Sequence, residues 1–343
     1  MELQDDTPIF TPGITRDDVL RYAALAAKWK EPPKDALDTL VLKSFDPNDN
    51  PERPARTNLF AKMEPYTMLD HVPFNPTDKF TQSTITGPEG TFKVSKGAPH
   101  VILHRAYNSA AIHDQAENTV NGFAKRGIRC LSVARSQTVA DASELTPETE
   151  RWEYLGVITF LDPPRFDTAE TIRRAKEYGV GVKMITGDQK LIAMEMARMI
   201  GLGDNILMAD VVPDLPADKK APPDTGAKYG KLMEDTDGFA QVFPEHKFMI
   251  VEALKQRGWV CGMTGDGVND APALKVANIG IAVEGATDAA QAAADIVLTD
   301  PGLSTIVDAI VLSRMIFQRL RNYVRTHTVS TVSTCCIVLR MYT

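Results

Sequence analysis

The stretch Met263-Thr264-Gly265-Asp266-Gly267-Val268-Asn269-Asp270 decides the fold, together with a shorter copy of it, Met184-Ile185-Thr186-Gly187-Asp188. Each copy directly follows or ends a short apolar run, at 259–263 and at 180–185. Glycine permits a tight turn there and a close approach of the backbone to an anion. A threonine hydroxyl and the free N–H groups of the turn can hydrogen-bond a phosphoryl oxygen. One copy alone is typical of an ordinary strand-to-helix turn, but two equivalent copies indicate a phosphoryl-binding site at the ends of two strands.

Strands and helices alternate on both sides of these phrases. Short apolar runs lie at 155–160, 180–185, 259–263, 279–283 and 296–298, and helical patterns separate the earlier ones at 168–177, 191–200 and 245–255. This alternation predicts an α/β, doubly wound parallel sheet in a domain spanning 154–315, with its ligand at the carboxyl ends of the strands. The stretch 202–241 is rich in Asp, Pro, Gly and Lys, and we expect it to be mostly loop.

Residues 1–153 predict a separate α+β domain. Apolar residues at helical spacing indicate a helix at 17–30, capped by Thr15, and further helices at 33–45, 99–106 and 112–126. Strand-like segments occupy 66–74, 79–86, 91–95 and 128–135. The turn residues TGPEG (86–90) predict a hairpin between the second and the third of these segments.

The composition excludes several classes of protein. Of 343 residues, 43% are hydrophobic and 24% are charged, which is typical of a globular chain and not of a disordered or fibrous one. The net charge of −7 includes no basic excess, so we expect no nucleic-acid partner. The four cysteines match neither a disulfide framework nor a zinc site. Residues 1–10 do not resemble a secretory leader, and the cytosol is the expected compartment.

The C-terminal part combines a basic helical pattern with a Thr/Ser/Val-rich run. Residues 304–326 predict a long amphipathic helix with a basic end, formed by Arg314, Arg319, Arg321 and Arg325. Residues 326–343 continue with a Thr/Ser/Val run that leads into CCIVL. This run is too short and too polar for a complete membrane span and is typical of the beginning of one. We therefore interpret 316–343 as a stalk helix and the start of a membrane segment.

Charged residues near the two repeated phrases suit phosphoryl chemistry. Asp266 and Asp270 offer carboxylate oxygens to a hard cation such as Mg²⁺. Lys247 lies at the start of the helix that precedes the longer phrase, where it can supply the positive charge that phosphoryl transfer requires. A lysine on a helix is also commonly a solvated surface residue, so this interpretation depends on the neighbouring motifs.

Residues of the first half fit a nucleotide pocket. Lys96 and Gly97 lie between a strand and a helix, where a glycine lets a ligand come close. Phe74 ends a neighbouring strand and could stack on a planar base. Arg129 and Asp38 add charges. Taken alone, Phe74 could equally be a core residue, and the charged residues could equally be solvated. Their combination predicts a nucleotide pocket.

At these residues the chain resembles the cytoplasmic part of P-type cation-transporting ATPases, and in particular the plasma-membrane proton pumps of plants, fungi and protists. The resemblance rests on KGAP (96–99), LDPPRFDTAETI (161–172), VKMITGDQ (182–189), FPEHK (243–247), the long stretch 263–306 and IFQRLRNYV (316–324). The first half matches more loosely, through DALD, FNP, KGAP and IRCL. DPPR, MITGDQ and EGATDAA are similar to proton pumps rather than to calcium or sodium pumps.

The resemblance implies ATP-driven proton export across the plasma membrane, with this region on the cytosolic side. It also implies a phosphorylation domain of the haloacid-dehalogenase type, with Mg²⁺ at Asp266 and Asp270. The implied ATP-binding residues are Asp38, Phe74, Lys96, Gly97, Arg129, Asp162 and Arg165, the last two near the phosphates. The implied catalytic residues are Thr186, Gly187, Asp188, Lys247, Asn269 and Asp270.

The chain departs from this family in one decisive respect. The family's nucleophile is the aspartate of a DKTGT sequence, and no DKTG occurs in these 343 residues. The actuator domain with its TGE loop is not recognisable either. We interpret the chain as a piece of a pump that begins after the phosphorylation motif. Without a carboxylate nucleophile no aspartyl phosphate forms, so we expect neither autophosphorylation nor pumping by this chain alone.

Two further expectations follow from the departure. The missing segment would be a central strand, so its neighbours should show unpaired edges. ATP binding by the first half should survive, because the residues of that pocket are present.

Three alternatives stay open. A stand-alone phosphatase of the haloacid-dehalogenase type would need a nucleophile strand, for which Asp5-Asp6 is the only nearby candidate, and no apolar strand precedes it. A non-catalytic nucleotide-binding fragment could regulate a partner pump. A P-type pump for another cation would have similar cytoplasmic motifs, because the ion is chosen in membrane helices. The sequence does not indicate an oligomeric state.

Overall fold

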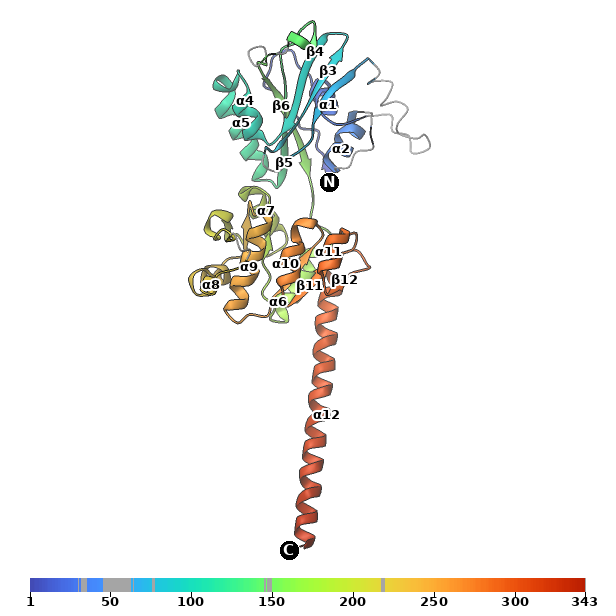
Figure 1. Ribbon diagram of the computed structural model, residues 1–343, viewed down its shortest axis with the longest axis vertical. Coiled ribbons are helices and arrows are strands. Elements are labelled where there is room, and N and C mark those ends of the chain that lie inside the picture. Colours follow the sequence, from blue (N-terminus) through green and yellow to red (C-terminus); the bar gives the residue numbers. More distant parts are fainter. Residues whose placement is uncertain are drawn as a thin grey trace, which may run out of the picture. The chain divides into compact units, whose positions relative to one another are not determined.

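The computed structural model describes residues 1–29, 31, 36–45, 63, 65–75, 78–144, 146, 150–216 and 220–342. The chain divides into two compact units, Met1–Pro163 and Pro164–Thr343 (Figure 1). This division falls later than the boundary predicted after residue 153, because the strand that begins there belongs to the first unit.

The first unit is built on an antiparallel sheet. Its strand order is β1-β6-β5-β4-β3-β2, with the bounds Glu2–Leu3 (β1), Thr67–Val72 (β2), Phe80–Gly87 (β3), Gly90–Gly97 (β4), Ile128–Arg135 (β5) and Glu153–Leu161 (β6). The predicted hairpin is confirmed, since β3 and β4 pair from Phe80↔Gly97 to Gly87↔Gly90. The placement of the run 155–160 in the parallel sheet is wrong, because β6 pairs antiparallel with both β5 and β1. A continuous apolar run shows burial on both faces but does not reveal which sheet it joins.

Helices pack on both faces of this sheet. On one face α1 (Arg16–Leu25) contacts β4, β5 and β6, and α2 (Ala36–Phe45) packs on α1. On the other face α4 (Pro99–Arg105) and α5 (Ser109–Ala124) contact β5. Two core clusters result, and the successive residues Val133 and Ala134 of β5 belong to different ones, as the alternation of side chains along a strand requires.

The predicted cap of α1 is confirmed. The Thr15 hydroxyl accepts a hydrogen bond from the Asp18 N–H at 3.2 Å, and the Asp18 carboxylate accepts one from the Thr15 N–H at 2.9 Å. This reciprocal arrangement satisfies two amide groups at the helix start.

The second unit contains the predicted parallel strands, but in two separate three-stranded sheets. One has the order β7-β9-β8, with the bounds Met184–Ile185 (β7), Ile206–Met208 (β8) and Gly238–Ala240 (β9). The other has the order β10-β11-β12, with the bounds Gly262–Gly265 (β10), Ile279–Ala282 (β11) and Ile296–Val297 (β12). Within the described residues, β7 and β10 each form the edge of a sheet. These two strands lead into the repeated phrases, so the expected unpaired edges are confirmed.

Helices α6 to α11 cover these sheets (Figure 1). Their bounds are Thr168–Glu177 (α6), Lys190–Met199 (α7), Thr225–Asp235 (α8), Pro244–Gln256 (α9), Ala271–Val276 (α10) and Asp288–Ala293 (α11). The expectation that 202–241 is mostly loop did not foresee the elements β8, α8 and β9, which lie there. Both strands are too short to show a periodicity, yet Ile206 and Phe239 are fully buried. The polar residues around these two strands hide from the sequence pattern that the strands contribute to the core.

The last helix, α12 (Ser304–Tyr342), extends the predicted amphipathic helix well beyond residue 326. Its first turns pack on α6, where Asp308 pairs with Arg174 and the Arg314 guanidinium donates to the Tyr178 carbonyl at 2.7 Å. From Leu312 to Ser333 its residues are exposed. In the part of the chain that the structure describes, no helix combines the length and the apolar character needed to cross a membrane.

Candidate functional site

The loop after β7 is held by backbone hydrogen bonds. The Thr186 N–H donates to the Phe239 carbonyl at 2.9 Å, and the Thr186 carbonyl accepts from the Val242 N–H at 3.0 Å. The Thr186 hydroxyl accepts from the Asp188 N–H at 3.1 Å. Because a hydroxyl also carries one donor, the Thr186 O–H can still donate to a phosphoryl oxygen. Gly187 is exposed, and a Cβ atom there would meet no atom closer than the Val242 carbonyl oxygen at 3.7 Å.

The loop after β10 is organised by Asp270, which is only 6% exposed. Its Oδ2 accepts from the N–H groups of Asp266 at 3.3 Å and Gly267 at 3.2 Å. Its Oδ1 accepts from the Lys247 ammonium at 2.6 Å. A Cβ atom on Gly265 would lie 2.5 Å from the Asp270 Cβ, so the glycine is needed for this carboxylate to fold back over the loop.

The ion pair between Lys247 and Asp270 connects the two halves of the unit. Lys247 lies in the first turn of α9, which follows β9, whereas Asp270 follows β10. Both side chains are largely buried, and breaking such a pair would leave an uncompensated charge. The ammonium has three donors, so contact with Asp270 leaves it able to donate to a second anion as well.

Asp266 and Asn269 are both exposed next to this ion pair. The Asp266 main chain is fixed, since its carbonyl accepts from the Thr287 N–H at 2.8 Å. No group of three or more His, Cys, Asp or Glu side chains within the described residues could hold a metal ion. Mg²⁺ commonly binds through one or two carboxylates and keeps several waters. The exposed Asp266 carboxylate fits that mode, whereas Asp270 is already engaged by Lys247 and two N–H groups.

In the first unit, Lys96 and Asp38 form a second ion pair. Lys96 lies near the end of β4 with only 4% of its surface exposed, and its ammonium lies 2.5 Å from the Asp38 carboxylate on α2. Phe74 follows β2 and is 56% exposed. An exposed phenylalanine of this kind can stack on a base, while the buried lysine holds a fixed positive charge.

The structure requires glycine at position 97 for a different reason from the predicted approach of a ligand. A Cβ atom there would lie 2.5 Å from the Lys79 carbonyl oxygen and 2.6 Å from Phe80. The neighbouring Ala98 N–H donates to the same carbonyl at 2.9 Å. The space beside Gly97 is therefore filled by the chain that enters β3, so this glycine serves the approach of two backbone segments.

Arg129 lies apart from Lys96 along the sheet. Lys96 pairs with Val133 of β5, four residues beyond Arg129, which corresponds to about 13 Å along a strand. Arg129 lies 3.6 Å from the Asp162 carboxylate in the same unit. Arg165 belongs to the second unit, where it is exposed. The structure thus brings Asp38 to Lys96 and Asp162 to Arg129, as two separate pairs.

The sequence interpretation missed His71. This residue of β2 is half-buried, and its Nδ1 lies 2.9 Å from the Ser83 hydroxyl of β3. Burial lowers its pKa, with Asp38 opposing the shift and Lys28 and Lys96 adding to it. His71 therefore lies in the electric field of the Lys96–Asp38 pair. Its position three residues before Phe74 on a predicted strand was the available signal.

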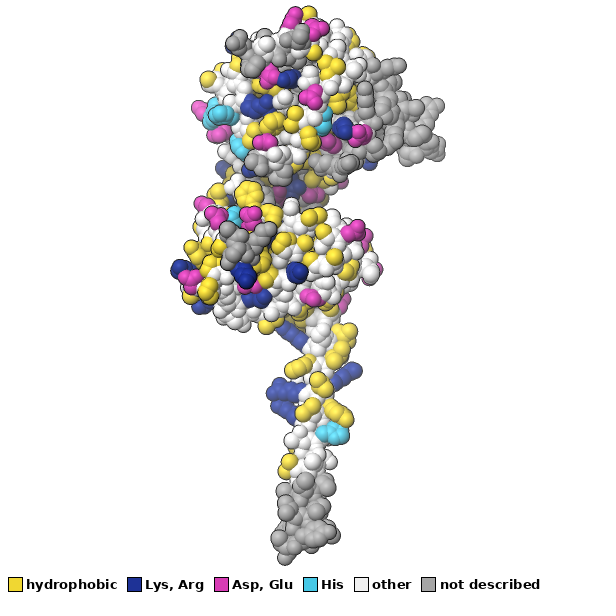
Figure 2. Space-filling model, viewed as in Figure 1, with side chains coloured by type: hydrophobic (Ala, Val, Ile, Leu, Met, Phe, Trp, Pro, Cys, Tyr) yellow, Lys and Arg dark blue, Asp and Glu magenta, His cyan; other side chains and the backbone are white. Residues whose placement is uncertain are grey.

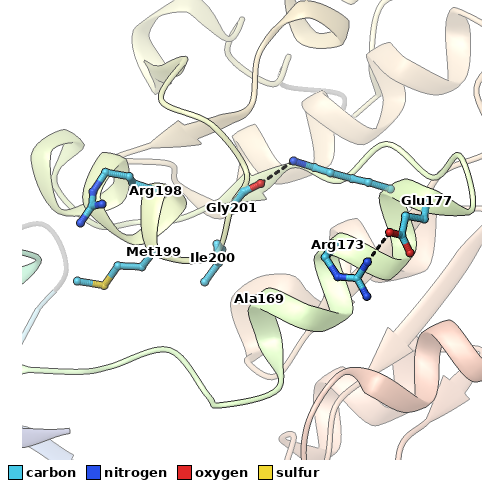
Figure 3. Close-up of a pocket in the computed structure, with 8 residues that line it drawn as sticks. Ala169, Arg173, Glu177, Arg198, Met199, Ile200 and Gly201 are labelled. Carbon is cyan, nitrogen blue, oxygen red and sulfur yellow. Dashed lines mark hydrogen bonds and ion pairs between the residues drawn. The ribbon is translucent and has the colours of Figure 1, made fainter.

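A hollow of ≈ 590 Å³ elsewhere in the second unit is lined by α6 and the end of α7 (Figure 3). Its cations are already engaged. Arg173 pairs with Glu177, and the Lys176 ammonium donates to the Gly201 carbonyl at 2.7 Å. Arg198 pairs with Glu195. None of the predicted site residues lines this hollow.

Comparison with known proteins identifies the fold family. A model described as haloacid dehalogenase-like hydrolase matches residues 102–278, which is just over half of the chain. The chain belongs to the haloacid dehalogenase-like hydrolases. The matched residues include both repeated phrases, after β7 and after β10. The expected haloacid-dehalogenase class is therefore confirmed.

Relatives of this haloacid dehalogenase-like hydrolase are named as ATPases. It is 51% identical over 98% of its length to proteins called "Probable proton ATPase 1A" and "Probable proton ATPase 1B" from Leishmania donovani. It is 43% identical over 96% of its length to a "Probable plasma membrane ATPase" from Dictyostelium discoideum. The resemblance to P-type proton pumps is thereby confirmed. The chain spans only 32% of the length of the Leishmania proteins and 29% of the Dictyostelium protein.

Proposed function

We propose that this chain supplies the nucleotide-binding and phosphoryl-handling parts of a P-type ATPase that exports protons across the plasma membrane. The observation that carries the proposal is the pair of repeated loops after β7 and β10, with Lys247 and Asp270 joined between them at 2.6 Å. The names of the relatives support the proton as the transported ion and the plasma membrane as the location. In this proposal the described units lie on the cytosolic side.

Each unit has its own part in the proposed reaction. In the first unit, Phe74 stacks on the adenine of ATP, and Asp38 holds the Lys96 ammonium in a fixed position beside the nucleotide. Arg129, paired with Asp162, would contribute charge about 13 Å farther along the sheet from Lys96. A fixed cation loses little freedom when an anionic ligand binds, which favours binding.

In the second unit, the Thr186 hydroxyl and the N–H groups near Gly187 and Asp188 receive the transferred phosphoryl group. Lys247 donates to it while Asp270 keeps the ammonium in place. Asp266, with Asn269 beside it, would hold Mg²⁺ through one carboxylate and water. When bound there, Mg²⁺ would neutralise charge on the phosphate oxygens. The acceptor would be an aspartate in a part of the full protein outside this chain, since the 343 residues contain no DKTG.

The nucleotide part of the proposal is tested by ATP binding to the purified chain, measured by calorimetry. We expect the chain to bind ATP and the Lys96→Ala variant to bind it about tenfold more weakly or worse, as expected for the loss of a hydrogen bond to a charged group. Lys93→Ala is the matched control, because Lys93 lies on the same strand and pairs with Glu150.

Folding is checked separately, since Lys96→Ala leaves the Asp38 carboxylate without its partner. The double variant Lys96→Met/Asp38→Asn removes both charges, and it should fold while binding ATP as weakly as the single variant. An ATP affinity unchanged in both variants would remove Lys96 from the site. No ATP binding by the folded parent chain would overturn the nucleotide-binding role.

A further inference from the structure

Beyond Asp308, all the charged residues of the C-terminal helix are positive. After Asp308 the sequence contains five arginines and no acidic residue, although the whole chain carries a net charge of −7. Four of these arginines, Arg314, Arg319, Arg321 and Arg325, lie on the exposed part of α12. No Asp or Glu of the described residues forms an ion pair with Arg319, Arg321 or Arg325. The positive charge of this helix is therefore uncompensated within the described chain.

Three of the four exposed arginines of α12 lie on one side of the helix. At about 100° per residue, Arg314, Arg321 and Arg325 fall within an arc of about 40°, and we call these three residues the arginine stripe. The opposite arc holds four large exposed apolar side chains, Leu312, Ile316, Leu320 and Tyr323, with Arg319 at its edge. Figure 2 shows dark blue and yellow side chains along the part of this helix that is drawn in colour. This is the pattern of a basic amphipathic helix.

We propose that Arg321 and Arg325 of the arginine stripe bind the headgroups of anionic phospholipids at the membrane surface, while Arg314 orients the stripe. The inference rests on the membrane location proposed above, and it adds the class of lipid and the residues that recognise it. Three features favour a lipid surface over an acidic protein. The opposite arc is apolar apart from Arg319 at its edge, no acidic residue follows Asp308 in the helix, and residues 326–339 contain no charged residue apart from the titratable His327. A basic helix with an apolar face binds at the boundary between headgroups and acyl chains.

The N-terminal end of the arginine stripe is held against the second unit. Arg314 donates to the Tyr178 carbonyl at the end of α6, and Asp308, six residues before Arg314, pairs with Arg174. Arg321 and Arg325 lie one helical turn apart further along α12. Arg314 therefore orients the helix, while Arg321 and Arg325 are exposed to contact phosphate groups.

The test is co-sedimentation of the 343-residue chain with vesicles of phosphatidylcholine alone and of phosphatidylcholine with about 30% phosphatidylserine. We expect binding to the anionic vesicles only, weakening as salt is added. Each arginine near an anionic surface strengthens binding about fivefold, so Arg321→Gln/Arg325→Gln should bind about 25-fold more weakly. Arg321→Lys/Arg325→Lys keeps both charges and should bind nearly as well as the parent chain.

The matched control is Arg173→Gln/Arg198→Gln, which removes the same charge from exposed positions on α6 and α7. It should bind the anionic vesicles like the parent chain. Equal binding to both kinds of vesicle, or an equal loss in the control, would overturn the proposal. So would binding to heparin without binding to anionic vesicles, which would indicate another polyanion.

ATP binding is measured on the same preparations. Vesicle binding that fails while ATP binding persists overturns the lipid site alone. The reverse result overturns the nucleotide role and leaves the lipid site standing.

Discussion

At the scale of single residues, two buried lysine–carboxylate pairs define the candidate sites. Lys96 pairs with Asp38 in the first unit, and Lys247 pairs with Asp270 in the second. Each carboxylate accepts from a largely buried ammonium group and so fixes the position of that group. The sequence identified all four residues as candidates. It did not identify the pairs, because 58 residues separate one pair and 23 the other.

His71 makes the first unit sensitive to pH. Burial lowers its folded-state pKa below the ordinary value of 6.5, so the unfolded chain takes up its proton first as the pH falls. The stability of the unit should therefore be unaffected above the unfolded pKa and decline as the pH falls from about 6.5 towards the folded pKa. His71→Asn should show a smaller loss between pH 7 and pH 5 in urea-unfolding experiments.

His100 contributes in the same direction, since burial also lowers its pKa. The variant should consequently keep part of the slope, and His71→Asn/His100→Asn should keep less. A slope unchanged by His71→Asn would contradict the buried neutral state of this residue.

At the scale of helices and strands, the sequence predicted an element correctly where its periodicity and its end or turn residues were both present. Helix α6 has the predicted bounds, 168–177, and β3 and β4 form the predicted hairpin. Membership of a sheet was not predictable for β6, because both of its faces are buried and its pairing depends on distant strands. The short strands β8 and β9 carry too few residues for a pattern, so tertiary packing decided the structure there.

The capping box of α1 offers a test at this scale. Thr15→Ala removes the side chain that accepts from the Asp18 N–H, and we expect the first unit to lose about 1 kcal/mol of stability. Chemical unfolding followed by circular dichroism measures the change. Thr119→Ala, in the exposed middle of α5, should cost less than about 0.5 kcal/mol. Equal effects of both substitutions would show that the cap contributes nothing special.

At the scale of the whole molecule, each of the two parallel sheets carries one of the repeated loops directly after an edge strand. The strands that carry both loops, β7 and β10, end their sheets within the described residues. The sequence led to this expectation only through the resemblance to P-type pumps and the lack of DKTG. Periodicity alone predicted one continuous sheet, because it cannot show that a partner strand is missing.

We accordingly expect no phosphoenzyme from this chain. Incubated with radiolabelled ATP and Mg²⁺, the purified chain should show no acid-stable, hydroxylamine-sensitive label, since an acyl phosphate requires a carboxylate nucleophile. A full-length P-type proton ATPase treated in parallel should be labelled. Hydroxylamine-sensitive label on the chain itself, lost in Asp5→Asn/Asp6→Asn, would instead support the stand-alone phosphatase.

The open edges of β7 and β10 also have a consequence for handling the protein. An edge strand with free N–H and C=O groups is a template on which a strand of another molecule can pair. Exposed apolar residues next to β10, Trp259 and Val260, would add to the attraction between copies. At high concentration the chain should therefore cross-pair and precipitate. Dilute conditions, or a soluble peptide that occupies the edge, should keep it in solution.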